Sequence, residues 1–499
     1  MLLSLREQDV ITDKSHFKYN SQLGERRLRI LNRYTGAFFS FLEIMRTNDT
    51  IAAVATALAP GGIGIVRVSG EDSITIADRI FKGKKSLCDA DTHTINFGYV
   101  YDQDEPVDQV LCMVMKAPNS YTGENVVEIQ CHGGVLVMQR ILSLCIEAGA
   151  NLAEPGEFTK RAFLNGKMDL SQAEAVADII DAETQNSLKA GVSQLKGKLS
   201  SEINDIRGIL LHEIAFIEAA LDDPEHYSLD DYGKELEIKA AQISSRLERL
   251  IKNSDAGIII KNGIDTAIIG RPNAGKSSVL NLLSGSDRAI VTDIAGTTRD
   301  TLTEHISLGG IRLNLTDTAG LRESDNMVEQ IGVDRAKKAA DRADLILFIV
   351  DGSEDFSSED KDILKLVEGK NIIVLINKQD RNDWKPVTDE SVLKYPFVGF
   401  SAKNGQGLKE LESIIKDKFF NGEINLNDEI YVTGVRHLQA LKAALNSVKL
   451  VREGIALGQT EDLLSVDLTD AYESLGTITG ETVGEDIINE IFAKFCMGK

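Results

Sequence analysis

Apolar positions recur with strand-like spacing in the first third of this chain. Short apolar runs, largely β-branched, occur at residues 63–68, 110–115 and 126–130, and runs of this length predict buried strands. Apolar residues at the spacing of one helix face follow over residues 135–146. Because strand and helix patterns are mixed within residues 48–167, they predict a compact α+β domain.

Helical spacing replaces this pattern from about residue 168 onward. Apolar stripes with the helical period cover residues 210–217, 236–251, 438–451 and 485–495. These stripes predict long helices before and after the middle of the chain.

The start of the first of these helices has its own signal. Ser171 and Glu174 have the spacing of a capping box, in which two side chains satisfy N–H groups at a helix start. We therefore expect a helix with Ser171 as its N-cap.

Between the helical segments, residues 263–421 return to strand patterns. Strand-like runs lie at residues 266–269, 313–316, 372–376 and 397–400. The simplest arrangement is a separate domain inserted into one helical domain, which a fold tolerates when the ends of the insert lie close together.

A phosphate-binding motif opens this inserted segment. The sequence from Gly270 to Ser277, GRPNAGKS, fits the pattern G-x-x-x-x-G-K-[ST] and lies between a strand-like run and the helical spacing that begins at Val279. Its glycines let backbone N–H groups surround a phosphate, Lys276 adds a positive charge, and the Ser277 hydroxyl can bind Mg²⁺. The predicted contacts of this nucleotide site are Asn273, Ala274, Gly275, Lys276, Ser277 and Ser278.

A second motif predicts which base is bound. Asp380 follows the strand-like run at 372–376 closely, and its carboxylate can accept hydrogen bonds from both the ring N–H and the exocyclic amine of guanine. Adenine offers no such donor pair, and a buried acceptor without its donor is costly, so GTP is favoured over ATP. The predicted base contacts are Asn377, Lys378, Asp380, Ser401, Ala402 and Lys403.

Two further segments are predicted to sense the γ-phosphate. Asp317 follows the strand-like run at 313–316 and can hold the magnesium shell, while Gly320 can present its N–H to the phosphate. Thr298, in the loop that includes Gly296 and Thr297, can complete the magnesium site. Motifs of this kind, in this order, are typical of a GTPase.

One position departs from the small GTPases of the Ras type. Leu321 stands where those proteins have the glutamine that orients the attacking water, and an isobutyl group cannot orient water. Hydrolysis is therefore either very slow or dependent on another side chain. The acids between Arg322 and Glu329 either supply that side chain or belong to a solvated loop.

Charge limits the possible partners. The 499 residues include 77 acidic and 55 basic side chains, a formal charge of −22, so the molecule as a whole repels polyanions. Broad electrostatic binding of nucleic acid is not expected. Any contact with RNA must use a local basic patch or be made by a partner.

Cysteine usage and hydropathy predict a cytoplasmic protein. The five cysteines, Cys88, Cys112, Cys131, Cys145 and Cys496, show no C-x-x-C spacing and no nearby histidine cluster, which argues against disulfides and against zinc. No apolar run approaches the roughly 20 residues that span a bilayer.

The first 44 residues differ in character from the rest of the chain. They are arginine-rich like an organellar presequence, but their acidic residues do not fit one. We expect a disordered extension, or a chain start placed upstream of a true initiator at Met45.

Four motifs resemble the tRNA-modifying GTPase family MnmE, also called TrmE, and the resemblance covers nearly all of residues 48–499. The motifs are Asn48 to Ala53 with Gly61 to Arg67, Glu154 to Lys167, Gly296 to Asp300, and the terminal Phe495-Cys496-Met497-Gly498-Lys499. Met497 stands where the family usually has isoleucine, and both residues are apolar.

The resemblance implies a multidomain α/β protein with three parts. These are an N-terminal folate-binding and dimerisation domain over residues 45–167, a helical domain over 168–262 and 422–499, and an inserted Ras-like P-loop G domain over 263–421. It implies a homodimer that forms a heterotetramer or a larger complex with the flavoprotein MnmG, which carries FAD. The tRNA would be bound mainly through that partner.

The reaction implied by the resemblance is a tRNA modification. An aminomethyl or carboxymethylaminomethyl group is added at C5 of the wobble uridine of certain tRNAs, and a tetrahydrofolate derivative donates the one-carbon unit. GTP hydrolysis and association of the G domains drive the cycle.

The resemblance also assigns metal and catalytic residues. Asn273, Thr292, Ile294 and Thr297 match the ligands of a K⁺ ion, whose charge would act where an arginine finger acts in other GTPases. Ser277 and Thr298 match the magnesium ligands, and Glu329 matches the acid that positions water. In the two segments predicted to sense the γ-phosphate, the predicted nucleotide contacts are Thr292, Asp293, Ile294, Ala295, Gly296, Thr297, Thr298, Asp317, Thr318, Ala319 and Gly320.

Folate binding is assigned by the resemblance to Arg67, Glu128, Lys167 and Lys499. Their residue types alone would describe the first three as surface charges at strand ends. Cys496 either takes part in the chemistry or packs against its apolar neighbours. For His132, which also matches a family pattern, we expect structural packing.

Two other functions remain open from the sequence. The first is a ribosome-assembly GTPase, a group with the same GTPase motifs that lacks the N-terminal domain and the terminal motif and usually adds a basic RNA-binding module. The second is a GTP-driven conformational switch that contributes no chemistry to RNA.

Overall fold

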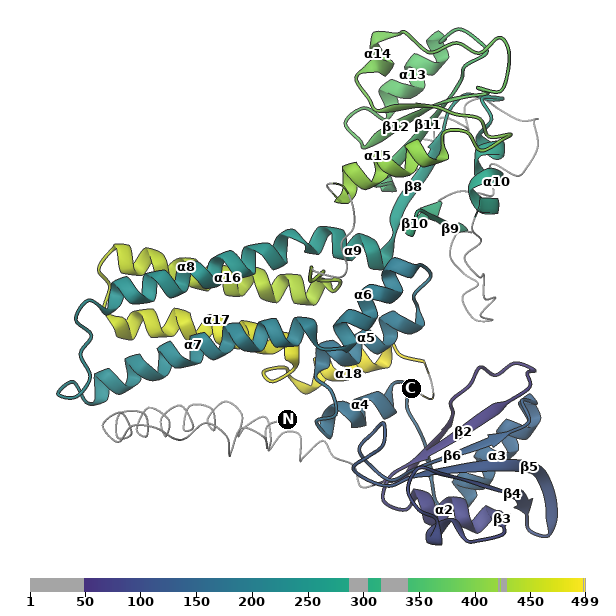
Figure 1. The fold of residues 1–499 in the computed structure, drawn as a ribbon, viewed down its shortest axis with the longest axis vertical. Coiled ribbons are helices and arrows are strands. Elements are labelled where there is room, and N and C mark those ends of the chain that lie inside the picture. The colour runs from purple at the N-terminus through teal and green to yellow at the C-terminus, as the bar shows by residue number, and fades with distance from the viewer. Residues whose placement is uncertain are drawn as a thin grey trace. The chain divides into compact units, whose positions relative to one another are not determined.

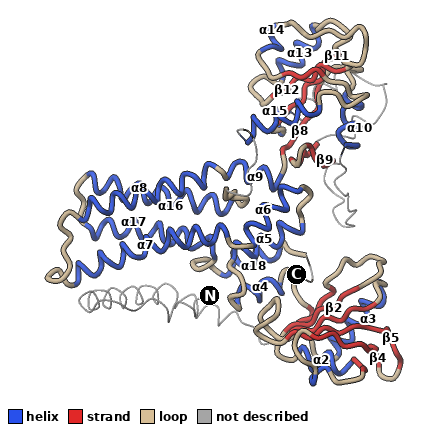
Figure 2. Tube along the Cα trace, in the orientation of Figure 1, coloured by secondary structure: helices blue, strands red, loops and turns tan. Residues whose placement is uncertain are grey.

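The computed structural model describes residues 49–286, 304–315, 340–420, 422, 429–496 and 498. The chain divides into two compact units, one made of residues 1–177, 194–248 and 439–499 and the other of residues 178–193 and 249–438. Among the described residues, the first unit holds a seven-stranded sheet and the second a six-stranded sheet (Figures 1 and 2).

The sheet of the first unit has the strand order β3-β4-β5-β6-β2-β1-β7. Its strands are β1 (Ile51–Val54), β2 (Gly64–Ser69), β3 (Phe81–Gly83), β4 (Thr94–Asp102), β5 (Glu105–Met115), β6 (Val126–Cys131) and β7 (Asn151–Leu152). Neighbouring strands are antiparallel except for β1 and β7. The strands predicted at 63–68, 110–115 and 126–130 are confirmed as β2, β5 and β6.

Helices α2 (Ser73–Ile80) and α3 (Val135–Glu147) pack on this sheet. Val66, Ile129, Met138 and Ile141 belong to the resulting buried cluster. A short 3₁₀ turn, Leu87–Asp89, follows β3. Side chains alternate between the two faces of a sheet. On β4, alternate positions point away from the buried cluster and expose apolar side chains.

The other regular elements described in the first unit are helices. They are α4 (Glu157–Leu164), α5 (Leu170–Ile180), α7 (Lys198–Asp222), α8 (Tyr232–Lys252), α16 (Val435–Ala456), α17 (Glu461–Thr479) and α18 (Glu485–Ala493), of which α5, α8 and α16 continue into the second unit. Figure 1 shows α7, α8, α16 and α17 side by side. Ion pairs join α7 to α8 through Arg246 and Glu202, and α8 to α16 through Arg452 and Glu237.

The predicted cap of α5 is wrong by two residues. Asp169 accepts a hydrogen bond from the Gln172 N–H at 3.0 Å, and the Gln172 side chain accepts one from the Asp169 N–H at 3.0 Å. Ser171 lies inside the helix and donates to the Asp169 carboxylate. A carboxylate two residues earlier offers the same reciprocal capping, so the helix begins sooner than Ser171 predicted.

The sheet of the second unit has the order β13-β12-β11-β8-β10-β9. Its strands are β8 (Ile264–Ile269), β9 (Glu304–Leu308), β10 (Ile311–Leu315), β11 (Leu345–Asp351), β12 (Ile372–Asn377) and β13 (Phe397–Gly399). All pairs are parallel except β9 with β10. The strands predicted at 266–269, 372–376 and 397–400 are confirmed, and β10 confirms the part of 313–316 that is described.

Two buried clusters lie on opposite faces of this sheet because its central strands are buried on both sides. Leu347 of β11 points into one cluster and its neighbour Phe348 into the other. Among the described residues, this unit also holds α9 (Ser254–Asn262), α10 (Lys276–Ser286), α13 (Ser358–Leu366), α14 (Glu390–Leu393), α15 (Leu408–Phe420) and all but the end of α6 (Gln185–Leu195). The sequence boundaries at residues 167, 262 and 421 stay predictions.

Candidate functional site

The phosphate-loop motif connects β8 to α10, as its strand and helix patterns predict. Lys276 begins α10, and its Nζ donates to the carbonyl oxygens of Gly270 and Arg271 at 2.8 Å each. Burial lowers the pKa of this lysine because desolvation disfavours the charged form. The phosphate loop therefore surrounds the Lys276 ammonium group, which lies where it can bind a phosphate.

Two residues of the loop require left-handed backbone. Asn273 has φ 61° and Gly275 has φ 100°, and asparagine and glycine are the residues that adopt this region most readily. A Cβ on Gly275 would lie 2.1 Å from Nδ2 of Asn377. Glycine at this position thus lets the phosphate loop approach the base motif.

Asn377 joins three of the predicted nucleotide-binding segments. It ends β12 and is 2% exposed. Its Nδ2 donates to the Ala274 carbonyl at 2.9 Å, and its Oδ1 accepts from the Ala402 N–H at 3.1 Å. One buried side chain therefore holds the phosphate loop, the base motif and the Ser401–Lys403 segment together.

Asp380 is held as an ionised acceptor beside these segments. Its Oδ1 accepts a hydrogen bond from Ser401 Oγ at 2.7 Å, and Lys403 Nζ lies 3.9 Å from Oδ2. The hydrogen bond from Ser401, with a smaller contribution from Lys403, lowers the pKa of Asp380. A carboxylate in this state suits a ligand with two neighbouring N–H donors, as guanine has.

Lys378 is fixed by an acid that no sequence motif singled out. Its Nζ forms an ion pair with Asp351, at the end of β11. Asp351 is 2% exposed. Burial acts to raise its pKa, but the bonds from Lys378 and Ser353 outweigh it and the pKa is lowered. The alignment of β11 with β12 pairs Asp351 with Asn377, a pairing that no local sequence signal gives.

Several predicted site residues lie outside the described residues. They are Thr292, Asp293, Ile294, Ala295, Gly296, Thr297, Thr298, Asp317, Thr318, Ala319, Gly320, Glu329 and Lys499, together with residues 1–44 and Met45.

A second cluster of predicted residues forms in the first unit. Arg67 and Glu128 face each other in register on β2 and β6. Both Nε and Nη2 of Arg67 lie 2.9 Å from Oε1 of Glu128, and the two side chains are 15% and 13% exposed. Interpreting them as surface charges at strand ends is therefore wrong, because they form a largely buried pair in the middle of two strands.

The C-terminal segment reaches this pair. Nη1 of Arg67 donates to the Gly498 carbonyl at 3.3 Å. Gly498 has φ 87°, and a Cβ there would lie 2.2 Å from the Val54 carbonyl oxygen. The chain end therefore lies against β1 and β2, which explains a glycine in the terminal motif.

Two aromatic rings that were not predicted from the sequence line the same cluster. The Arg67 guanidinium carbon lies 5.6 Å from the centroid of Tyr121 and 5.4 Å from that of Phe158. The Tyr121 hydroxyl and Thr159 Oγ1 are 2.9 Å apart, and burial raises the pKa of Tyr121. Phe158 belongs to the Glu154–Lys167 motif and could have been found from it.

Lys167, Cys496 and His132 are more exposed. Lys167 donates to the Pro118 carbonyl at 3.0 Å. Cys496 is exposed, so the alternative that it packs is not supported. The side chain of His132 is 72% exposed and pairs with Asp108 at 2.7 Å. The expected packing of His132 is wrong, because its ring lies at the surface beside a carboxylate. All five cysteines are free.

No described helix has the length and apolar character needed to cross a bilayer.

Two family models match the chain. A model described as the MnmE helical domain matches residues 170–496, and one described as the GTP-binding protein TrmE N-terminus matches residues 50–167. These matches confirm the predicted N-terminal and helical parts of a multidomain α/β protein.

Curated relatives match over nearly their whole length. The tRNA modification GTPase MnmE of Lachnoclostridium phytofermentans is 48% identical over 90% of this chain and 99% of its own. Those of Acetivibrio thermocellus and Bacillus mycoides are 47% and 45% identical over 91% and 90% of this chain, and over 100% and 99% of their own. The chain therefore belongs to the MnmE family of tRNA modification GTPases and is a GTP hydrolase.

Proposed function

We propose that this GTPase is activated by K⁺ and acts with a flavoprotein partner of the MnmG type on tRNA. The reaction adds an aminomethyl or carboxymethylaminomethyl group at C5 of the wobble uridine, with a one-carbon unit from a tetrahydrofolate derivative. The observation that carries the proposal is the meeting of Arg67, Glu128 and the chain end at Gly498. A ribosome-assembly GTPase or a pure switch has no evident use for this second cluster.

The residues of this cluster fit a folate. Both bonds from Arg67 go to Oε1 of Glu128, and no donor among the described residues reaches Oε2. That oxygen can accept hydrogen bonds from the amidine-like N–H groups of a pterin. Tyr121 and Phe158 provide an apolar wall, and Lys167, with Lys499, can meet the carboxylates of the glutamate tail. When bound, tetrahydrofolate supplies a one-carbon unit.

The GTPase residues have separate tasks in the proposed cycle. Lys276 and the loop N–H groups hold the β- and γ-phosphates, and Ser277 with Thr298 would bind Mg²⁺. Asn273, with Thr292, Ile294 and Thr297, would hold K⁺, which supplies positive charge next to the phosphates. Glu329 would orient water in place of the missing glutamine, whose position Leu321 occupies.

Replacing K⁺ with Na⁺ at constant ionic strength tests this cycle. We expect GTP turnover to fall at least roughly tenfold, because a site sized for K⁺ holds the smaller Na⁺ poorly and then lacks the charge that an arginine finger supplies elsewhere. Asn273→Gly keeps the left-handed backbone at φ 61° but removes the ligand, so its turnover should be equally slow in both salts. Equal wild-type rates in K⁺ and Na⁺ would refute the potassium assignment.

Exposed apolar side chains on β4 and β5 of the first unit support the proposal of a homodimer. Ile95, Phe97 and Tyr99 alternate along β4 and are 60%, 58% and 40% exposed, and Leu111, paired with Phe97 across to β5, is 40% exposed. A contiguous exposed apolar strip of this kind is typical of an interface. We expect Phe97→Glu with Leu111→Glu to give monomers in sedimentation analysis. Leu457→Glu, on a residue 77% exposed elsewhere, serves as the control, and a dimeric double variant would refute this interface.

The chemistry and the RNA contact have their own tests. If Cys496→Ser still turns over GTP but no longer supports tRNA modification, the pure switch is excluded. The formal charge of −22 indicates that the flavoprotein makes most phosphate contacts with tRNA. Tight, salt-sensitive binding of tRNA by this chain alone would contradict that division of roles.

A further inference from the structure

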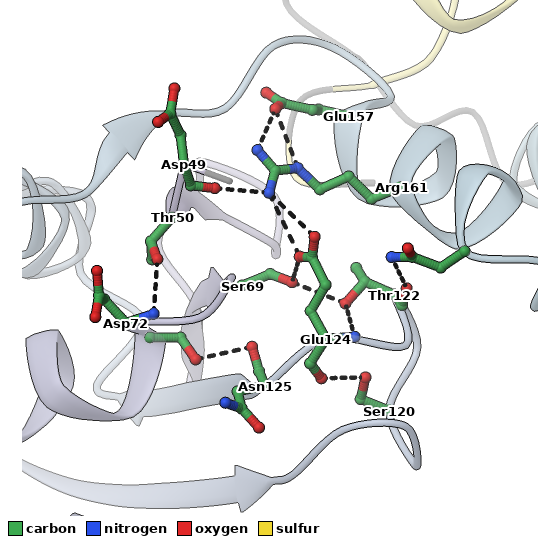
Figure 3. Close-up of polar contacts among 12 residues, drawn as sticks. Asp49, Thr50, Ser69, Asp72, Ser120, Thr122, Glu124, Asn125, Glu157 and Arg161 are labelled. Carbon is green, nitrogen blue, oxygen red and sulfur yellow. Dashed lines mark hydrogen bonds and ion pairs between the residues drawn. The ribbon is translucent and has the colours of Figure 1, made fainter. Parts of the chain in front are cut away.

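One buried arginine connects the parts that form the proposed folate cluster. Arg161 lies on α4 and is 5% exposed. Its guanidinium forms ion pairs with Glu124 at 3.2 Å and with Glu157 at 2.8 Å, and donates to the Asp49 carbonyl at 2.7 Å. Figure 3 shows these carboxylates and the carbonyl converging on the one side chain. A buried cation requires such complete pairing.

Glu124 extends the connection into the loop of residues 116–125. Its Oε2 accepts from Ser69 Oγ at 2.7 Å, and its backbone carbonyl accepts from Ser120 Oγ at 2.6 Å. Ser69 and Thr122 share a further hydrogen bond of 2.8 Å, and the Thr122 carbonyl accepts from Asn165 at 2.8 Å. The loop is therefore fixed on one side to β2 and on the other to the end of α4 (Figure 3).

This loop forms part of the folate cluster. Tyr121 lies over the Arg67 guanidinium, and Pro118 supplies the carbonyl that Lys167 contacts. Neither residue belongs to a helix or strand, so its placement depends on the side-chain bonds of the loop. The bonds made by Glu124 and Thr122 lie within three residues of Tyr121 on the same loop.

The other end of the connection reaches the C-terminal segment. Phe492 and Phe495 pack with Phe163 of α4, and Lys160 of α4 donates to Asn489 of α18 at 2.7 Å. Phe495 is three residues before Gly498, whose carbonyl accepts a hydrogen bond from Arg67. Helix α4 therefore supports the chain end on one face and holds the 116–125 loop through Arg161 on another.

We propose that Arg161 is a positioning residue for the one-carbon chemistry, because it ties the 116–125 loop to helix α4, whose Lys160 and Phe163 hold the segment before the chain end. The inference rests on the proposed folate site. Arg161 acts on the cluster through Glu124. Its planar guanidinium binds two carboxylates and a carbonyl at once, and a lysine ammonium, a single point charge, cannot keep all three in the same geometry.

The test uses two conservative variants of the full chain, Arg161→Lys and Glu124→Gln. The control is Arg140→Lys, because Arg140 also pairs with two carboxylates, Asp102 and Glu147, but is 36% exposed. Binding of 5-formyltetrahydrofolate is measured by calorimetry. Hydrogen exchange of residues 116–125 and 495–498, thermal unfolding and GTP turnover are followed in the same samples.

We expect both variants to remain folded, to hydrolyse GTP at the wild-type rate and to exchange faster at 116–125 and 495–498. Their dissociation constants for 5-formyltetrahydrofolate should rise at least about tenfold, as is typical when a group that orients binding residues is lost. Arg140→Lys should match wild type in every measurement. A purely structural role predicts lower unfolding temperature with unchanged folate affinity, and that result would overturn the proposal.

A failure of the folate assignment gives a different result. If the wild-type chain does not bind 5-formyltetrahydrofolate, the cofactor assignment is wrong. In that case, hydrogen exchange still tests whether Arg161 positions the two segments. Unchanged exchange at residues 116–125 and 495–498 in Arg161→Lys overturns the positioning role, and faster exchange at both segments supports it.

Discussion

Replacing Asn377 with alanine should break the connection between the phosphate loop and the base motif. The substitution removes the donor to the Ala274 carbonyl and the acceptor for the Ala402 N–H, at 2.9 and 3.1 Å. Ala274 is fully buried, so its carbonyl cannot find water without local rearrangement. Strands β11 and β12 keep their backbone pairing, and the effect should therefore concentrate at the loops.

The size of the effect depends on the two lost partners. Leaving a buried backbone group without its partner costs about 1 to 3 kcal/mol. The buried Ala274 carbonyl accounts for the larger share, and the half-buried Ala402 N–H for a smaller one. We expect the second unit to lose about 2 to 4 kcal/mol of unfolding free energy. Affinity for GDP should fall roughly 10- to 100-fold, because binding must then also order both loops.

Urea unfolding and titration with a fluorescent GDP analogue measure the two effects. Asn371→Ala is the matched control, since Asn371 also donates to a backbone carbonyl, that of Asp344 at 3.1 Å, but is exposed. It should change stability by less than about 1 kcal/mol and leave GDP affinity unchanged. If Asn377→Ala is no more harmful than Asn371→Ala, the bridging role of Asn377 is refuted.

Three further predictions concern the same nucleotide site. Asp380→Asn should weaken GDP binding roughly 100-fold or more and favour xanthosine diphosphate, because an amide can donate where xanthine has a carbonyl; unchanged base preference in competition titrations would contradict the role of Asp380. Gly275→Ala should abolish GDP binding in the same titration, since its Cβ would lie 2.1 Å from Nδ2 of Asn377; wild-type affinity would show that the loop rearranges freely. The pKa of Asp351 is lowered in the folded chain, so its ionised form stabilises the fold at pH values above its ordinary pKa of 3.8, and this stabilisation is lost as the pH falls through the lowered pKa. The difference in unfolding free energy between wild type and Asp351→Asn, measured by urea unfolding, should therefore become smaller on acidification. A difference that does not change with pH would count against the Lys378 pair.

Motifs whose geometry is local were predictable from the sequence. The phosphate loop needs only a strand, a turn and a helix that follow one another, and Gly270 to Ser277 carries all of that information. The base motif is similar, because Asn377 and Asp380 directly follow a continuous apolar run. In both cases the chemistry depends on neighbours in the chain.

Contacts between distant segments were not predictable in the same way. Arg67 and Glu128 are 61 positions apart and meet only through the register of β2 and β6. Their assignment came from resemblance, and residue types alone gave a wrong interpretation. Helix α17 was also missed, although Leu464, Leu468 and Leu475 recur at helical spacing along it. The small residues Ala471 and Gly476 are buried on the same helix. Burial of small residues results from close helix packing that hydropathy does not detect.

The most direct test of the account compares tRNA nucleosides by mass spectrometry in a strain that lacks this gene, with and without its restoration. The account predicts that wobble uridines lose the C5 group in the deletion strain and regain it with the wild-type chain, but not with Gly275→Ala. Wobble uridines that stay fully modified without the gene would contradict the coupling of this GTPase to tRNA modification.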